Sequence, residues 1–199
     1  MNKVNNSYQS KVLDESILAF YCLQGLDTNN AGFNQFESHS SYEIYLLHEG
    51  QCKFFIHDQI YDLQAGDIIL LNGLTLHKSN TVSPVTYTRS MIHFFPSWLK
   101  KMLPVLGMLN LLDPFQKLNN CILRTGFNAS GQYVAEKIKW LAKQLEAIDQ
   151  EYQSTGRINS LLETELKIEF LQLLMKIYKM SEYPHFQVEL KKTEKRQHA

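Results

Sequence analysis

The chain has 199 residues, of which 44% are hydrophobic and 12% aromatic. This is enough apolar material for one hydrophobic core with a smaller attached part. Twenty Lys and Arg residues balance twenty Asp and Glu residues, whereas a protein that binds nucleic acid by itself is usually basic. The composition therefore argues against a self-contained DNA-binding protein.

The cysteines Cys22, Cys52 and Cys121 are odd in number and form no C-x-x-C pair. This pattern suggests neither a disulfide framework nor a zinc knuckle, and we expect small buried side chains in a reducing compartment. The N-terminal residues lead into no long apolar run, and no stretch approaches the roughly 20 apolar residues of a membrane span. We therefore expect a cytoplasmic protein.

The first half of the chain is predicted to be all β. Residues 1–16 are polar and rich in asparagine, which indicates a flexible arm. Over residues 17–96, short β-branched and aromatic runs alternate with turn residues, a pattern typical of an antiparallel barrel or sandwich. The expected strands cover residues 17–23, 42–47, 53–57, 66–71 and 87–95, with a hairpin turn at 57–59.

After Pro96 the apolar residues recur at helical spacing. A short helix is expected near 97–106, and a second helix over 130–153 with one buried face, formed by Val134, Ile138, Leu141, Leu145, Ile148 and Tyr152. A third helix over 160–180 begins where Ser160 and Glu163 have the spacing of a capping box. Residues 97–185 are thus predicted to be a helical subdomain, and the fold class is α+β.

The third predicted helix is apolar on two faces. One face carries Leu162, Leu166, Phe170, Leu173 and Ile177, and the other carries Leu161, Ile168, Leu171, Met175 and Tyr178. The second face either packs within the chain, against the short helix near 97–106 and the segment with Leu109, Leu111 and Leu112, or forms a homodimer interface. The pattern leaves both open. The polar, charged residues 186–199 indicate a linker.

Two motifs lie on the predicted strands. The first is His39-Ser40-Ser41-Tyr42-Glu43, with Gly50 after six further residues, and the second runs from Gly66-Asp67 to His77. They resemble the two signature motifs of the cupin barrel, a double-stranded β-helix. In detail they resemble the N-terminal sensor domains of the AraC/XylS family of bacterial transcription regulators.

The resemblance implies an effector-binding and dimerising domain that is not an enzyme. It also implies a homodimer joined through helices that follow the barrel. DNA would be bound only by a helix-turn-helix domain that follows the linker in the resembled family and is not in this chain. The arm over residues 1–16 is expected to fold over the effector or to contact that domain.

Metal-binding cupins carry two histidines two residues apart, a glutamate, and a later histidine. The matching positions here are Glu37, His39, Glu43 and His77, so a glutamate replaces the first histidine. Residues two apart on a strand face the same way and can converge inside a barrel, and such donors suit Zn, Mn, Fe(II) or Ni. Because the first histidine is lost, we expect no metal and no other cofactor, with these groups bonding to each other or to a ligand.

Three more residues are candidates for lining a ligand pocket. Tyr45 shares the parity of Glu43, and Arg89 and His93 share parity on the last predicted strand. Aromatic faces bind sugar C–H surfaces, and an arginine fork holds a carboxylate or a pair of hydroxyls. The predicted ligand-binding residues are Glu37, His39, Glu43, Tyr45, His77, Arg89 and His93.

These observations favour the sensing domain of a transcription regulator that binds a sugar or another polar metabolite. One alternative is a small metal-dependent cupin enzyme, an isomerase or a dioxygenase, that uses Glu37, His39, Glu43 and His77. Another is a free-standing carbohydrate-binding module. Metal content separates the enzyme from the other two.

Overall fold

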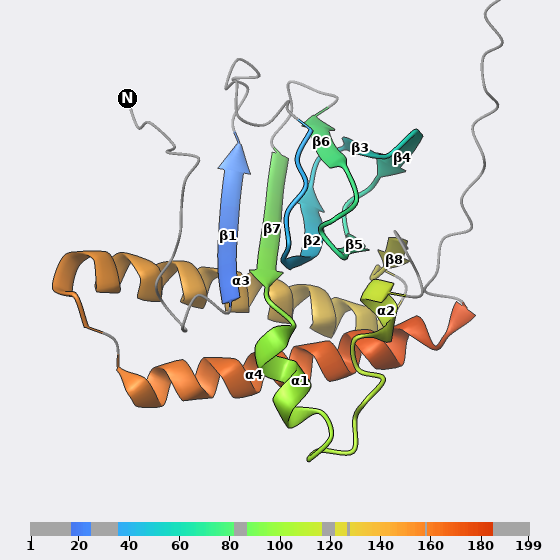
Figure 1. Ribbon diagram of the computed structural model, residues 1–199. Helices are drawn as coiled ribbons and strands as arrows, with labels where there is room; N and C mark the ends of the chain where they lie inside the picture. Colours follow the sequence, from blue (N-terminus) through green and yellow to red (C-terminus); the bar gives the residue numbers. More distant parts are fainter. Residues whose placement is uncertain are drawn as a thin grey trace, which may run out of the picture.

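The computed structural model describes residues 17–24, 36–81, 87–116, 122–126, 128–157 and 159–184, with the backbone alone for 17–24 and for Thr81. The predicted arm, residues 1–16, and the predicted linker, residues 186–199, lie outside this part. Helices α3 and α4 run side by side along one side of the strands (Figure 1). The elements are β1 (Ile17–Gln24), β2 (Tyr42–Glu49), β3 (Cys52–Ile56), β4 (Gln59–Leu63), β5 (Asp67–Leu71), β6 (His77–Thr81), β7 (Tyr87–Phe94), α1 (Ser97–Met102), α2 (Asp113–Gln116), β8 (Ile122–Arg124), α3 (Ala129–Thr155) and α4 (Ser160–Ser181).

The strands form two antiparallel sheets. The larger has the order β1-β7-β2-β5-β8, and the smaller has the order β4-β3-β6. Among the described residues no strand pairing joins the edges of one sheet to those of the other, so the expected cupin-like barrel is not closed and consists of two antiparallel sheets. The isolated bridge between Glu37 and His77 is a contact between the two motif segments outside these ladders.

Three strands were not predicted as such: β4, β6 and β8. Strand β4 follows the expected hairpin turn, where His57 has a positive φ of 52°. Strand β8 lies in the half that was predicted to be helical, and it pairs with β5. Its three residues are too few to leave a periodic pattern, so its strand conformation depends on that pairing.

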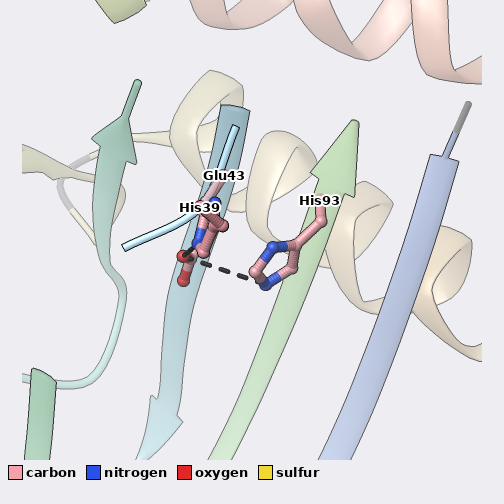
Figure 2. A group of neighbouring side chains, drawn as sticks. All are labelled: His39, Glu43 and His93. Carbon is pink, nitrogen blue, oxygen red and sulfur yellow. Dashed lines mark hydrogen bonds and ion pairs between the residues drawn. The ribbon is translucent and has the colours of Figure 1, made fainter. Parts of the chain in front are cut away.

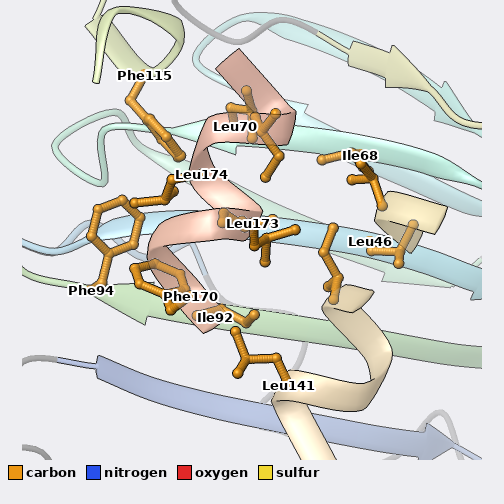
Figure 3. Packing of buried hydrophobic residues seen from close by; sticks show 14 of the residues in the cluster. Leu46, Ile68, Leu70, Ile92, Phe94, Phe115, Leu141, Phe170, Leu173 and Leu174 are labelled. Atoms are coloured by element: carbon orange, nitrogen blue, oxygen red, sulfur yellow. The ribbon is translucent and has the colours of Figure 1, made fainter. Parts of the chain in front are cut away.

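Each face of the larger sheet contributes side chains to a different hydrophobic core. Ile44 and Ile92 pack with α3 and α4 in the larger core, as Figure 3 shows for Ile92 beside Phe170 and Leu173. Tyr45 and Leu47 face the smaller sheet instead and form a second core with residues such as Phe54. Alternation along β2 and β7 therefore places every second side chain between the sheets.

Cys52 is buried in the second core as a free thiol, as the sequence predicted. The side chain of Cys22 and the whole of Cys121 lie outside the described residues.

The long helices match their predicted spans closely. The predicted face of α3 is buried, with Tyr152 half-buried at its end. Helix α4 is capped by Asn159, whose Oδ1 accepts the backbone N–H of Leu161 and of Leu162, so the capping box predicted at Ser160 is wrong. Asparagine caps helices as well as serine does, and here it stands one residue earlier. Among the described helices none is both long and apolar enough to cross a membrane.

Helix α1 ends at Met102, earlier than expected. Pro104 has no backbone N–H with which to continue the helix toward Lys100. The chain turns over residues 103–107 instead, and Gly107 has a positive φ of 67°.

The described part of the chain covers the second apolar face of α4 only in part. Leu161 is 65% exposed, Ile168 51% and Met175 41%, while Leu171 and Tyr178 are half-buried at the edge of the core. The alternative that this face packs within the chain is therefore wrong for Leu161, Ile168 and Met175. The homodimer interface stays a prediction.

Candidate functional site

Five of the predicted ligand-binding residues come together around the carboxylate of Glu43. Its Oε2 atom lies 3.2 Å from Nε2 of His39, 3.2 Å from Nε2 of His77 and 3.8 Å from Nε2 of His93. Figure 2 shows His39 and His93 turned toward this carboxylate. Glu37 lies at the rim, 63% exposed, with Oε1 4.0 Å from Nε2 of His77. Three imidazoles thus converge on one buried carboxylate oxygen.

Strand pairing and one loop contact build this cluster. Glu43 on β2 stands opposite His93 on β7 in the strand register. Backbone hydrogen bonds join Glu37 to His77 in both directions, at 2.9 and 3.0 Å, and the N–H of His39 donates to Gly73 at 2.8 Å. The first motif therefore lies along the end of the second.

Each imidazole ring is held at its Nδ1 atom. Nδ1 of His77 lies 2.7 Å from the carbonyl oxygen of Thr75, to which it donates. Nδ1 of His39 lies 3.0 Å from both the carbonyl oxygen and the Oγ of Ser41. The same hydroxyl is 3.4 Å from Nδ1 of His93. These contacts leave the three Nε2 atoms directed at Glu43.

Burial and the neighbouring charges shift the pKa values in this cluster. Burial by itself raises the pKa of Glu43, but the three surrounding imidazoles outweigh it and hold this pKa well below its usual value. Burial lowers the pKa of His93 to about 4. Burial also acts to lower the pKa of His77, but the contact with Glu43 raises it overall. The contacts with the imidazoles thus favour the ionised form of Glu43, and burial favours the neutral form of His93.

The other two predicted residues, Tyr45 and Arg89, belong to a second group. Tyr45 shares a hydrogen bond with the hydroxyl of Tyr87, and Nη1 of Arg89 donates to Oγ of Ser79 at 2.6 Å and to the Tyr87 hydroxyl at 3.4 Å. Four residues of strand, about 13 Å, separate Arg89 from His93. The ring of Phe54 contacts both groups, edge-on to Tyr45 and stacked on His77. The seven residues thus form two neighbouring groups rather than one, and their role in binding a ligand stays a prediction.

Sequence reasoning missed several members of these groups. Ser41 lies inside the first motif and is 6% exposed, so its place in the motif was a usable signal. Tyr87 shares the parity of Arg89 and His93 on the same strand, which was a second signal. Ser79 lies on β6, a strand that the residue pattern did not indicate.

Some of these donors are close enough to hold a metal ion together. One ligand atom each from His39, Glu43 and His93 lie within 4.8 Å of one another. The set expected from the cupin motifs included Glu37 and lacked His93. Imidazole and carboxylate donors suit Zn²⁺ and similar transition metals.

Residues 21–171 match the family of AraC-like ligand binding domains. The chain therefore belongs to this family, as the two motifs predicted. No curated protein matches the chain.

Several solved structures resemble the chain. Apo ToxT K231A from Vibrio cholerae is 14% identical over 88% of this chain and 60% of its own, with a TM-score of 0.50. The AraC-like transcriptional activator CuxR is 10% identical over 89% of this chain and 52% of its own, with a TM-score of 0.45. A cupin 2 conserved barrel protein from Salinispora arenicola is 13% identical over 45% of this chain and 72% of its own, with a TM-score of 0.35. The chain thus spans only part of each regulator, and at these identities the likeness concerns the fold.

Proposed function

We propose that this chain is the small-molecule-sensing and dimerising domain of an AraC-type transcription regulator. The match of residues 21–171 to the AraC-like ligand binding domains carries the proposal. On this proposal the protein acts in the cytoplasm, contacts DNA only through a further domain, and catalyses no reaction itself. The effector is a sugar or another polar metabolite.

The buried polar groups between the sheets support a polar effector. Glu43 is 2% exposed and Arg89 is 4% exposed, and burying such charged groups is unfavourable unless they are paired or serve a function. Hydroxyls of Tyr45, Tyr87 and Ser79 lie beside the arginine. Donors and acceptors of this kind recognise hydroxyl and carboxylate groups.

A thermal-shift screen of sugars, sugar acids and amino acids tests this proposal. A ligand at 100 times its Kd stabilises the folded state by about 2.7 kcal/mol, so we expect a Tm rise of roughly 5–10 °C. Arg89→Gln should abolish the rise, and the matched control Lys53→Gln, at a solvent-exposed site, should keep it. A response only to long-chain apolar compounds, or one that Arg89→Gln leaves unchanged, would contradict a polar effector held by this residue.

The exposed face of α4 supports the dimerising part of the proposal. Leu161, Ile168 and Met175 follow one another at intervals of seven residues. Leu171 and Tyr178 stand three residues after Ile168 and Met175, on the same face. This is the spacing of the a and d positions of a two-stranded coiled coil. A second copy of α4 presents the same apolar row, so the face is complementary to itself about a two-fold axis.

Light scattering across a range of protein concentrations tests the dimer. We expect a mass of two chains for the unmodified protein and of one chain for Ile168→Asp, because a carboxylate in the centre of the apolar row would be desolvated without a partner. Tyr133 on α3 is also 51% exposed, so Tyr133→Asp is the matched control and should remain dimeric. A dimer that survives Ile168→Asp would exclude this face.

A further inference from the structure

We propose that residues 102–109, which connect α1 to α2 and which we call the apolar turn, dock on the surface of an anionic lipid membrane. Val105 is 85% exposed and Leu109 69%, and Met102 and Leu106 are exposed as well. Figure 1 shows this segment projecting past α4, away from the sheets. Large apolar side chains gathered in one exposed segment are typical of a contact surface. The proposal goes beyond the sensing function and does not depend on it.

Hydrogen bonds within the apolar turn hold it in shape. Leu103 is buried in the larger core, and its carbonyl oxygen accepts the backbone N–H of Met108 at 2.9 Å. The N–H of Leu106 donates to the carbonyl oxygen of Met102 at 3.1 Å, and Pro104 has no backbone N–H that would need a partner. Backbone groups bonded in this way enter an apolar environment at a lower cost than groups bonded to water. The turn therefore presents its apolar side chains without having to refold.

Two lysines beside the apolar turn match the charge of an anionic membrane. Lys100 and Lys101 are exposed in the last turn of α1, and residues 97–112 contain no Asp or Glu. An apolar tip with lysines next to it fits the layers of a membrane surface, where acyl chains lie beneath anionic headgroups. The projecting shape favours lipid over a protein partner, because a protein would need a groove of matching shape, whereas a lipid surface adapts to the turn.

Co-sedimentation of the whole chain with lipid vesicles tests the proposal. With equal parts of phosphatidylglycerol and phosphatidylcholine, about half of the chain should sediment at roughly 1 mM accessible lipid, a weaker binding than that of one myristoyl group. With phosphatidylcholine alone the binding should be about 25-fold weaker, since each of the two lysines contributes about fivefold on an anionic surface. Less than about one twentieth of the chain sedimented with the anionic vesicles, at the same roughly 1 mM lipid, would refute the proposal.

A pair of variants tests whether the apolar side chains make the contact. Val105→Ser combined with Leu109→Ser should weaken binding to the anionic vesicles by about 10-fold or more, because these side chains then gain little from leaving water. Ile60 on β4 is 46% exposed, so Ile60→Ser is the matched control and should keep the binding within about twofold. Equal binding by both variants would overturn the role of the apolar turn.

A second pair of variants tests the lysines. Lys100→Gln combined with Lys101→Gln should weaken binding to the anionic vesicles by about 25-fold and remove most of its dependence on salt. Lys53 is also exposed but lies on β3, so Lys53→Gln should keep the binding within about twofold. Unchanged binding without the two lysines of α1 would contradict an anionic lipid as the partner.

Two further measurements decide the proposal independently of affinity. In Val105→Trp, the additional fluorescence relative to the unmodified chain should shift to shorter wavelength with anionic vesicles and be quenched by brominated acyl chains, whereas Ile60→Trp should show neither change. Light scattering should give the combined Val105→Ser and Leu109→Ser variant the same mass as the unmodified protein. A fall from two chains to one would place the apolar turn in an interface between copies and overturn its docking on a membrane.

Discussion

Arg124→Met is expected to lower the free energy of unfolding by about 3–5 kcal/mol, because it leaves a buried carboxylate without its counter-ion. Asp67 is completely buried at the start of β5. Nε of Arg124 donates to its Oδ1 at 2.7 Å and Nη2 to its Oδ2 at 3.0 Å, and Oδ2 also accepts the backbone N–H of Gln64. The hydrogen bond with Asp67 raises the pKa of Arg124, so the guanidinium stays charged throughout the accessible pH range.

Urea denaturation of Arg124→Met and of a matched surface variant measures this effect. Lys53 forms a similar ion pair with Asp62 at 3.2 Å, but its side chain is 44% exposed and that of its partner 80%. Lys53→Met should therefore change the free energy of unfolding by less than about 1 kcal/mol. If both variants lowered the free energy of unfolding by similar amounts, the ion pair with Arg124 would not be what stabilises the buried carboxylate of Asp67.

The same ion pair attaches the second half of the chain to the sheet. Thr125, next to Arg124, donates its backbone N–H and its Oγ1 to the carbonyl oxygen of Gly66, at 3.0 and 2.7 Å. These bonds hold β8 at the edge of the larger sheet, immediately before α3 begins. Without the Arg124 side chain, the two bonds from Thr125 and a short ladder to β5 remain to hold β8.

The alternation of side chains could be read from the sequence, but strand pairing could not. Parity placed Glu43 with Tyr45, and Arg89 with His93, on inward faces, which the two cores confirm. That His93 stands opposite Glu43 depends on the register between β2 and β7. No local pattern fixes that register, because strands far apart in the chain meet through packing of the whole core. Motif alignment therefore pointed to Glu37, whereas strand pairing brings His93 to the cluster.

Helix α4 also shows which features the sequence pattern predicts and which depend on packing between elements. Its periodicity predicted two apolar faces, and both exist. Which of them this chain covers depends on where α3 and the larger sheet lie, and they cover the face of Leu166 and Phe170 but not that of Ile168. The spacing of apolar residues within one helix cannot predict which of its two faces another element covers.

Gly73→Ala is expected to lower the free energy of unfolding by more than about 3 kcal/mol. Gly73 has a φ of +78°, where a side chain by itself costs about 1–2 kcal/mol. An added Cβ would also overlap the carbonyl oxygen of Ser41 and lie 2.5 Å from Nδ1 of His39. The backbone of the first motif would then have to leave the loop that precedes β6.

Gly107→Ala separates the two contributions. Gly107 has a similar φ of +67°, but a Cβ there would meet nothing within 4 Å, so only the conformational cost of about 1–2 kcal/mol applies. Urea denaturation of both variants measures the difference, which is the free-energy cost of the overlap between the added Cβ at position 73 and the first motif. Equal losses would mean that the segment carrying His39 gives way at little cost. The three imidazoles would then not be held in place before a ligand binds.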